Sequence, residues 1–69
     1  MKEYHFDIGD LVYVDFHGDI DVGICVEKTR QLEYRFHWQR EPTSMFYNQE
    51  DIRGWFEDGK CHAKRFPVK

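Results

Sequence analysis

Large apolar side chains stand at every second position from Leu32 to Trp38, with polar side chains between them. Successive side chains of a β-strand point to opposite faces, so one face of this segment would be apolar and the other polar. The pattern therefore predicts a strand that buries one face, rather than a helix. The apolar positions are Leu32, Tyr34, Phe36 and Trp38.

Two earlier segments of the chain alternate in the same way. The turn signal Gly9-Asp10 precedes the first, because glycine tolerates positive φ and aspartate can bond its own backbone. Gly23 lies inside the second segment and predicts a bulge or a tight bend. Polar stretches at 17–21 and 28–31 would connect the strands. The side chains expected in the shared core are Val12, Val14, Ile24, Val26 and Phe36.

The second half of the chain predicts shorter elements. Pro42 excludes the stretch 39–44 from a central strand, and residues 45–47 predict a short strand after it. The segment 48–52 has the character of a single helical or 3₁₀ turn with Asn48 as its N-cap. Residues 53–56 would form the last strand. The sequence thus predicts an all-β protein, a small five-stranded antiparallel barrel with one short 3₁₀ turn between its last two strands.

The 69 residues leave room for one domain only. A chain of about 60 residues buries roughly 60% of its extended-chain surface, so the core must be thin. Aromatic residues make up 17% of the chain and suit this limit, because each buries about 150–250 Å². We expect residues 1–59 to form the barrel. Residues 60–69 contain four basic residues and no acidic one, and we expect them to be a basic tail folded back on an acidic body.

Several classes of protein are disfavoured by what the sequence lacks. No apolar run approaches the roughly 18 residues of a membrane span, and residues 1–6 show no signal-peptide character. We therefore expect a cytoplasmic protein that does not act at a membrane. Cys25 and Cys61 are then expected to be free thiols, with Cys25 in the core.

Metal binding and catalysis are also disfavoured. The histidines and cysteines show no C-x-x-C or H-x-x-x-H spacing, so we expect no metal site. No phosphate-binding loop, nucleophile elbow or acid–base pair is present, so we expect no enzyme activity and no cofactor. A series of acids does not match the calcium-loop pattern and predicts a solvated face. These acids are Asp7, Asp10, Asp15, Asp19 and Asp21.

Four segments follow one another in an informative order: Ile8–Val14, Val22–Val26, Tyr34–Trp38, and Met45–Tyr47 leading to Asp51-Ile52. In this order they resemble a Tudor- or KOW-type small barrel of the Src-homology-3-like (SH3-like) fold. The resemblance is closest to uncharacterised small barrel proteins of tailed bacteriophages. It implies an SH3-like barrel and, for a viral protein, a place in the host cytoplasm or the virion. It implies no single activity, since such barrels bind peptides, bind nucleic acids and serve in assembly.

A thin barrel cannot bury all of its aromatic side chains, so some would be exposed and available for binding. Acidic neighbours would let them hold a cationic or proline-rich peptide by cation–π contact and stacking. The alternative is that most of them are core residues. The candidate aromatic face comprises Tyr13, Trp38, Phe46, Tyr47 and Trp55. The Tudor resemblance implies that the last four of these could form an aromatic cage.

The first functional hypothesis is therefore a non-enzymatic interaction module that binds a protein or peptide through this aromatic face and a sheet edge. The second is nucleic-acid binding of KOW type, through Arg30, Arg35, Arg40, Lys60, Lys64 and Arg65. KOW domains are generally rich in lysine and arginine, whereas the body of this chain is acidic and would repel phosphates. The third is a virion or assembly component that self-associates as a homo-oligomer.

Overall fold

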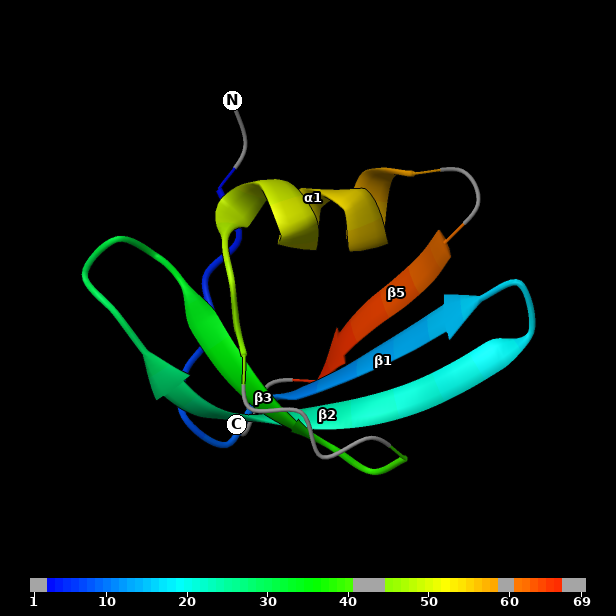
Figure 1. Ribbon diagram of the computed structural model, residues 1–69, viewed down its shortest axis with the longest axis horizontal. Coiled ribbons are helices and arrows are strands. Elements are labelled where there is room, and N and C mark those ends of the chain that lie inside the picture. Colours follow the sequence, from blue (N-terminus) through cyan, green and yellow to red (C-terminus); the bar gives the residue numbers. More distant parts are fainter. Residues whose placement is uncertain (1–2, 41–44, 59–60, 67–69) are drawn as a thin grey trace.

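The computed structural model describes residues 3–40, 45–58 and 61–66. The elements are β1 (Leu11–Phe16), β2 (Asp19–Lys28), β3 (Tyr34–Trp38), β4 (Phe46–Tyr47), α1 (Gln49–Glu57) and β5 (Cys61–Phe66). The strands form one antiparallel sheet in the order β4-β3-β2-β1-β5, and α1 lies across one face of it (Figure 1). A mostly-β fold with five antiparallel strands is thus confirmed. The sheet is open, with β4 and β5 as its edges.

The connection between β1 and β2 is shorter than the predicted loop over residues 17–21. Phe16 pairs directly with Asp19, so only His17 and Gly18 form the turn. Both have positive φ, 54° and 89°, as a two-residue hairpin turn of type I′ requires. The prediction of a long polar loop was wrong because the acids at 19 and 21 belong to β2, where polar residues face the solvent or a cavity.

Replacing His17 by Asn should stabilise the hairpin. Asparagine adopts the left-handed region more readily than histidine does, and it is a preferred residue at this position of a type I′ turn. We expect H17N to raise the free energy of unfolding by about 0.5 kcal/mol, measured by urea denaturation. Gly18→Ala is the opposite control, because it puts a Cβ on a backbone with φ of 89° and should destabilise the protein. A destabilised H17N variant would contradict the assigned turn.

The buried face of β2 is the opposite of the predicted one. Val12 and Phe36 are fully buried and Val14 is half-buried, as expected, but Ile24 and Val26 are 37% and 36% exposed. The buried positions of β2 are Gly23 and Cys25, which face inward. A Cβ at Gly23 would lie only 2.8 Å from the ring of Trp38, so the glycine allows that ring to lie flat on β2. Because the Trp38 ring is large, the buried face of β2 is opposite to the one predicted from the alternation of its apolar residues.

The predicted 3₁₀ turn is the start of an α-helix of nine residues. Its N-cap is Asn48, as predicted, whose side chain accepts a hydrogen bond from the Asp51 N–H at 2.9 Å. The strand predicted over 53–56 was wrong, because Ile52, Trp55 and Phe56 follow helical spacing and all pack toward the core. A short apolar run does not distinguish helix from strand. The fifth strand is formed instead by residues 61–66, within the segment expected as a basic tail.

The core lies between α1 and the sheet and is mainly aromatic. We define the aromatic core as Phe6, Tyr34, Phe36 and Trp38, each of which is at least nine-tenths buried. Phe36 is its centre, with ring centroids 5.2 Å from Phe6 and 5.6 Å from Trp38. Cys25, also in the core, is a free thiol as predicted, and burial raises its pKa. The Cys61 side chain lies outside the described residues.

An ion pair between a buried carboxylate and a partly exposed arginine joins β5 to the turn that opens β1. The carboxylate of Asp10 is 2% exposed and accepts from the Arg65 Nη2 at 2.8 Å and from Nε at 3.2 Å. It also accepts from the N–H of Asp7 at 2.9 Å. The guanidinium lies 5.3 Å from the centre of the Phe6 ring. Arg65, in the segment expected as a basic tail, thus contacts an acidic residue from within a strand of the sheet.

Candidate functional site

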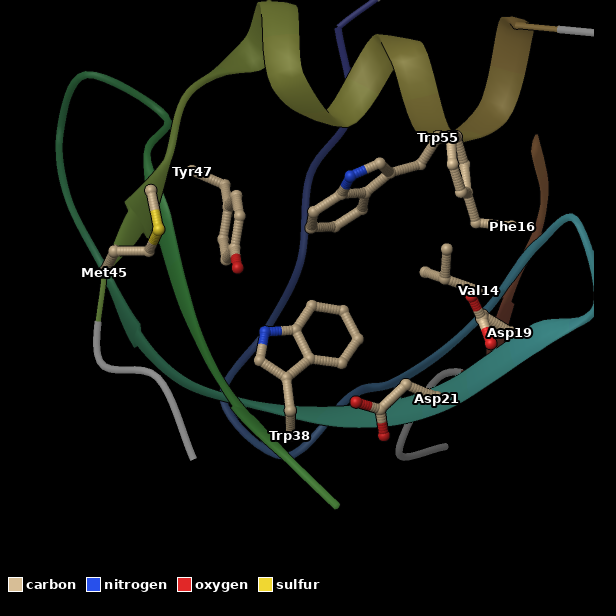
Figure 2. Close-up of a pocket in the computed structure, with 8 residues that line it drawn as sticks. All are labelled: Val14, Phe16, Asp19, Asp21, Trp38, Met45, Tyr47 and Trp55. Atoms are coloured by element: carbon tan, nitrogen blue, oxygen red, sulfur yellow. The ribbon is translucent and has the colours of Figure 1, made fainter. Parts of the chain in front are cut away.

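A cavity of about 340 Å³ opens on the helix side of the sheet, between α1 and the β1–β2 hairpin (Figure 2). We name it the aromatic pocket. Side chains from β1, β2, β3 and α1 meet there with residues of the segment that contains β4. The residues that line it are Val14, Phe16, Asp19, Asp21, Trp38, Met45, Tyr47 and Trp55.

Three aromatic rings form one wall of the pocket, each close to the other two. The ring of Trp55 lies 4.9 Å from that of Tyr47 and 5.5 Å from that of Trp38, with interplanar angles of 64° and 79°. Trp38 and Tyr47 are 6.1 Å apart and perpendicular. Figure 2 shows Trp55 projecting from α1 toward Trp38 on the sheet, with Tyr47 beside both. The rings pack edge to face against one another, and a cation in the cavity would be attracted by the ring faces that turn toward it.

One polar atom in this wall has no partner. Trp38 is 7% exposed, and its indole Nε1 is buried without a hydrogen-bond acceptor among the described residues. A buried donor that remains unpaired costs about 1–3 kcal/mol. Such groups are rare in folded proteins, and the usual remedy is an ordered water or a bound ligand. This nitrogen is itself buried, so it belongs to the packing of the wall and is not a contact that the open cavity offers to a ligand.

The opposite rim of the pocket is acidic. Figure 2 shows the carboxylates of Asp19 and Asp21 below Val14, facing the aromatic wall from β2. One oxygen of Asp21 accepts from its neighbour Val22 at 2.8 Å and from the backbone N–H of Arg40 at 3.0 Å. Within the described residues, no lysine or arginine side chain forms an ion pair with either acid. Both carboxylates thus leave negative charge at the mouth of the cavity.

The structure brings three residues of the predicted aromatic face together and separates two. Trp38, Tyr47 and Trp55 line the pocket. Tyr13 pairs with Val22 on the opposite face of the sheet, and Phe46 pairs there with Arg35. The alternation of β1 and β4 explains this separation, because neighbouring residues of a strand point to opposite faces. A cage that includes Phe46 is therefore excluded, and the five residues do not form one surface.

Sequence reasoning missed the other side chains of the pocket, above all the two acids. They were assigned to a loop, and their role depends on β2 beginning at Asp19. The signal was present, because Asp19, Asp21 and Gly23 stand two residues apart and share the inner face. Met45, which is 56% exposed at the rim, gave no signal of its own.

The basic residues of the second hypothesis do not form one surface in the described part of the chain. Arg65 faces inward to Asp10, whereas Arg35 pairs with Glu27 on the other face of the sheet. The guanidinium of Arg40 donates to the carbonyl of Ile20 at 3.2 Å. Arg30 lies in the β2–β3 turn and Lys64 on the outer side of β5, and Lys60 lies outside the described residues.

Neither a metal centre nor a membrane segment is found within residues 3–40, 45–58 and 61–66. No group of three or more histidine, cysteine or acidic side chains there could hold a metal ion. No helix in the same ranges combines the length and the apolar character that crossing a membrane requires. Comparisons with known protein families, with curated proteins and with solved structures found no match.

Proposed function

We propose that this protein is a non-enzymatic interaction module that binds a cationic segment of a partner protein in the aromatic pocket. The observation that carries the proposal is the wall of three mutually inclined rings opposite two carboxylates. The ring faces and the carboxylates complement one ligand type, a lysine or arginine side chain.

The physical terms favour a cation over a neutral or anionic ligand. A cation against Trp38, Tyr47 and Trp55 gains about 0.5–2 kcal/mol from the ring quadrupoles, depending on how far it is desolvated. A carboxylate about 6 Å away adds about 0.7 kcal/mol in a water-like dielectric. Nucleic-acid binding has no comparable support here, because Asp19 and Asp21 would repel a phosphate at this site.

The proposed evolutionary origin is an SH3-like barrel of Tudor or KOW type, encoded by a tailed bacteriophage. The support is the meander of strands followed by a helical element and a final strand, together with the opening Gly9-Asp10-Leu11-Val12. In this proposal the nine-residue α1 replaces the shorter helical turn of the family, and Trp55 on α1 supplies the upper wall of the pocket.

The test is titration with a short unstructured peptide that carries one lysine among glycine and serine residues, followed by NMR. We expect weak binding, with a dissociation constant in the millimolar range, because the terms above sum to only about 2–3.4 kcal/mol. The chain has two tryptophans, so its spectrum contains two indole N–H signals, which a Trp55→Phe variant assigns. The Trp38 signal should shift because its ring forms part of the wall that the ligand contacts. The same peptide with acetylated lysine should bind at least about tenfold more weakly.

A double variant that neutralises both aspartates tests the role of the acidic rim of the aromatic pocket. D19N/D21N should weaken binding of the lysine peptide about tenfold, because two carboxylates are lost. The matched control is E3Q/E50Q, which removes the same charge from exposed positions away from the pocket. Equal weakening by both pairs, or a Trp38 signal that does not move at saturation, would contradict the proposal.

A further inference from the structure

The face of the sheet opposite α1 carries a row of apolar side chains that no element of residues 3–40, 45–58 and 61–66 covers (Figure 1). We name it the outer face. Ile24, Leu11 and Phe66 stand in one row across β2, β1 and β5, and they are 37%, 41% and 51% exposed. The same face carries Tyr13 and Val22 in the next row and Phe46 on β4. In the ribbon diagram no helix or strand of the described residues lies against it (Figure 1). The solvent-exposed face of a sheet normally carries polar side chains. A large exposed apolar patch therefore usually marks an interaction site.

Charge distinguishes this face from the rest of the molecule. The chain has a net charge of -3. The register places two acids and two bases on the outer face, so that face is balanced: Asp15, Glu27, Arg35 and Lys64. Glu27 and Arg35 already form an ion pair at one end of the face. Two copies of an acidic protein repel each other, and a balanced face is where they can approach at least cost.

The outer face also carries both a hollow and a projecting ring. The hollow has a volume of about 410 Å³ and is lined by Leu11, Val22, Gly23, Ile24, His37 and Gln39. Phe66 pairs with Leu11 on the edge strand β5 and is half exposed. A two-fold dimer uses the same patch on both copies, so each copy must offer the shape that the other fills. Because the hollow and the exposed aromatic side chain lie on one surface, the ring of each copy can fill the hollow of the other, which gives two equivalent contacts.

We propose that the outer face binds a second copy of this chain, with Phe66 of each copy entering the hollow of the other. Five strands about 4.8 Å apart and about 20 Å long give a patch of roughly 400 Å² per copy. The two patches together amount to about 800 Å², less than the roughly 1,200 Å² of the smaller stable interfaces, so the dimer is a weak and transient one. Its centre is the row of Ile24, Leu11 and Phe66, and its rim is the balanced set of charges, the usual anatomy of an interface. This surface is separate from the aromatic pocket.

Sedimentation equilibrium of the full chain over about 10 μM to 1 mM tests the dimer. We expect the average mass to rise with concentration from 8.5 kDa toward twice that value. F66K should weaken self-association at least about tenfold, because it places a charge in the apolar centre. L11K, in the same row, should act in the same way and covers the case in which F66K fails to fold.

The matched control is F16K. Phe16 and Phe66 are both 51% exposed, but Phe16 lines the aromatic pocket on the helix side. F16K makes the same change of charge and should leave the dissociation constant within about twofold. A mass of 8.5 kDa at every concentration would overturn the proposal, as would a dimer that persists in folded F66K or L11K. A dimer lost in F16K alone would show that the pocket, not the outer face, joins the copies.

Discussion

Phe36→Ala should lower the free energy of unfolding by about 3–5 kcal/mol, a third or more of the total. Phe36 is fully buried, and its ring lies within 6.3 Å of four others, those of Phe6, Trp38, Tyr47 and Trp55. Removing a buried phenylalanine costs about 3–5 kcal/mol in lost transfer energy and cavity formation. At about 0.05–0.15 kcal/mol per residue, a chain of 69 residues has only about 3–10 kcal/mol to lose.

Urea denaturation followed by tryptophan fluorescence and by far-UV circular dichroism measures this loss. The matched control is Phe46→Ala. The Phe46 ring is 39% exposed on the outer face, and its centroid lies 6.0 Å from the Arg35 Cζ. That variant should lose less than about 1 kcal/mol. If F36A still unfolded cooperatively, with a free energy of unfolding within about 1 kcal/mol of that of the unchanged protein, the aromatic core would not be what stabilises the sheet.

The strands that sequence analysis placed correctly are those whose own side chains determine their faces. In β3 the large residues Tyr34, Phe36 and Trp38 alternate with polar ones, and each of the three is buried. In β2 the alternation of Val22, Ile24 and Val26 is equally regular, yet they face outward. Tertiary packing determines which face of β2 is buried. The face that carries Gly23 is the buried one, because only a glycine at that position leaves room for the Trp38 ring.

The helix and the pocket show a different limit. Residues 53–56 were predicted as a strand because a run of four residues is too short to reveal its period, and the cap at Asn48 alone does not set the helix length. Trp55, which was predicted as a site residue because a small core leaves some aromatics exposed, lines the aromatic pocket. Its partners came from four other segments of the chain. Their meeting depends on strand register, which local pattern does not specify across a loop.

The Asp10–Arg65 pair joins residues 55 positions apart and is the contact that holds β5 to the start of β1. Asp10 has a buried carboxylate, whereas the Arg65 side chain is 37% exposed. Burying a charge is unfavourable unless hydrogen bonds and an opposite charge compensate it. The pair therefore contributes little net stability when intact, but removing the arginine leaves a carboxylate that water reaches poorly.

Arg65→Met should consequently lower the free energy of unfolding by about 2–3 kcal/mol, somewhat less than a fully buried pair would lose because Arg65 is partly solvated. Methionine retains a flexible side chain of similar reach that can pack on Phe6, so the loss reports the charge rather than a cavity. Chemical denaturation at neutral pH measures it. The largest effect should fall on β5, which hydrogen exchange of the amides of residues 61–66 would show as earlier loss of protection.

Two further variants separate charge from geometry. Arg65→Lys keeps the charge but not the two parallel donors, so it should recover only part of the stability. Asp10→Asn removes the buried charge, and in the double variant D10N/R65M the loss should be smaller than the sum of the two single losses, by about 1–3 kcal/mol. Additive losses would mean that the two side chains do not interact in the folded protein. An R65M variant as stable as the unchanged protein would mean that β5 is held by its backbone pairing with β1 alone.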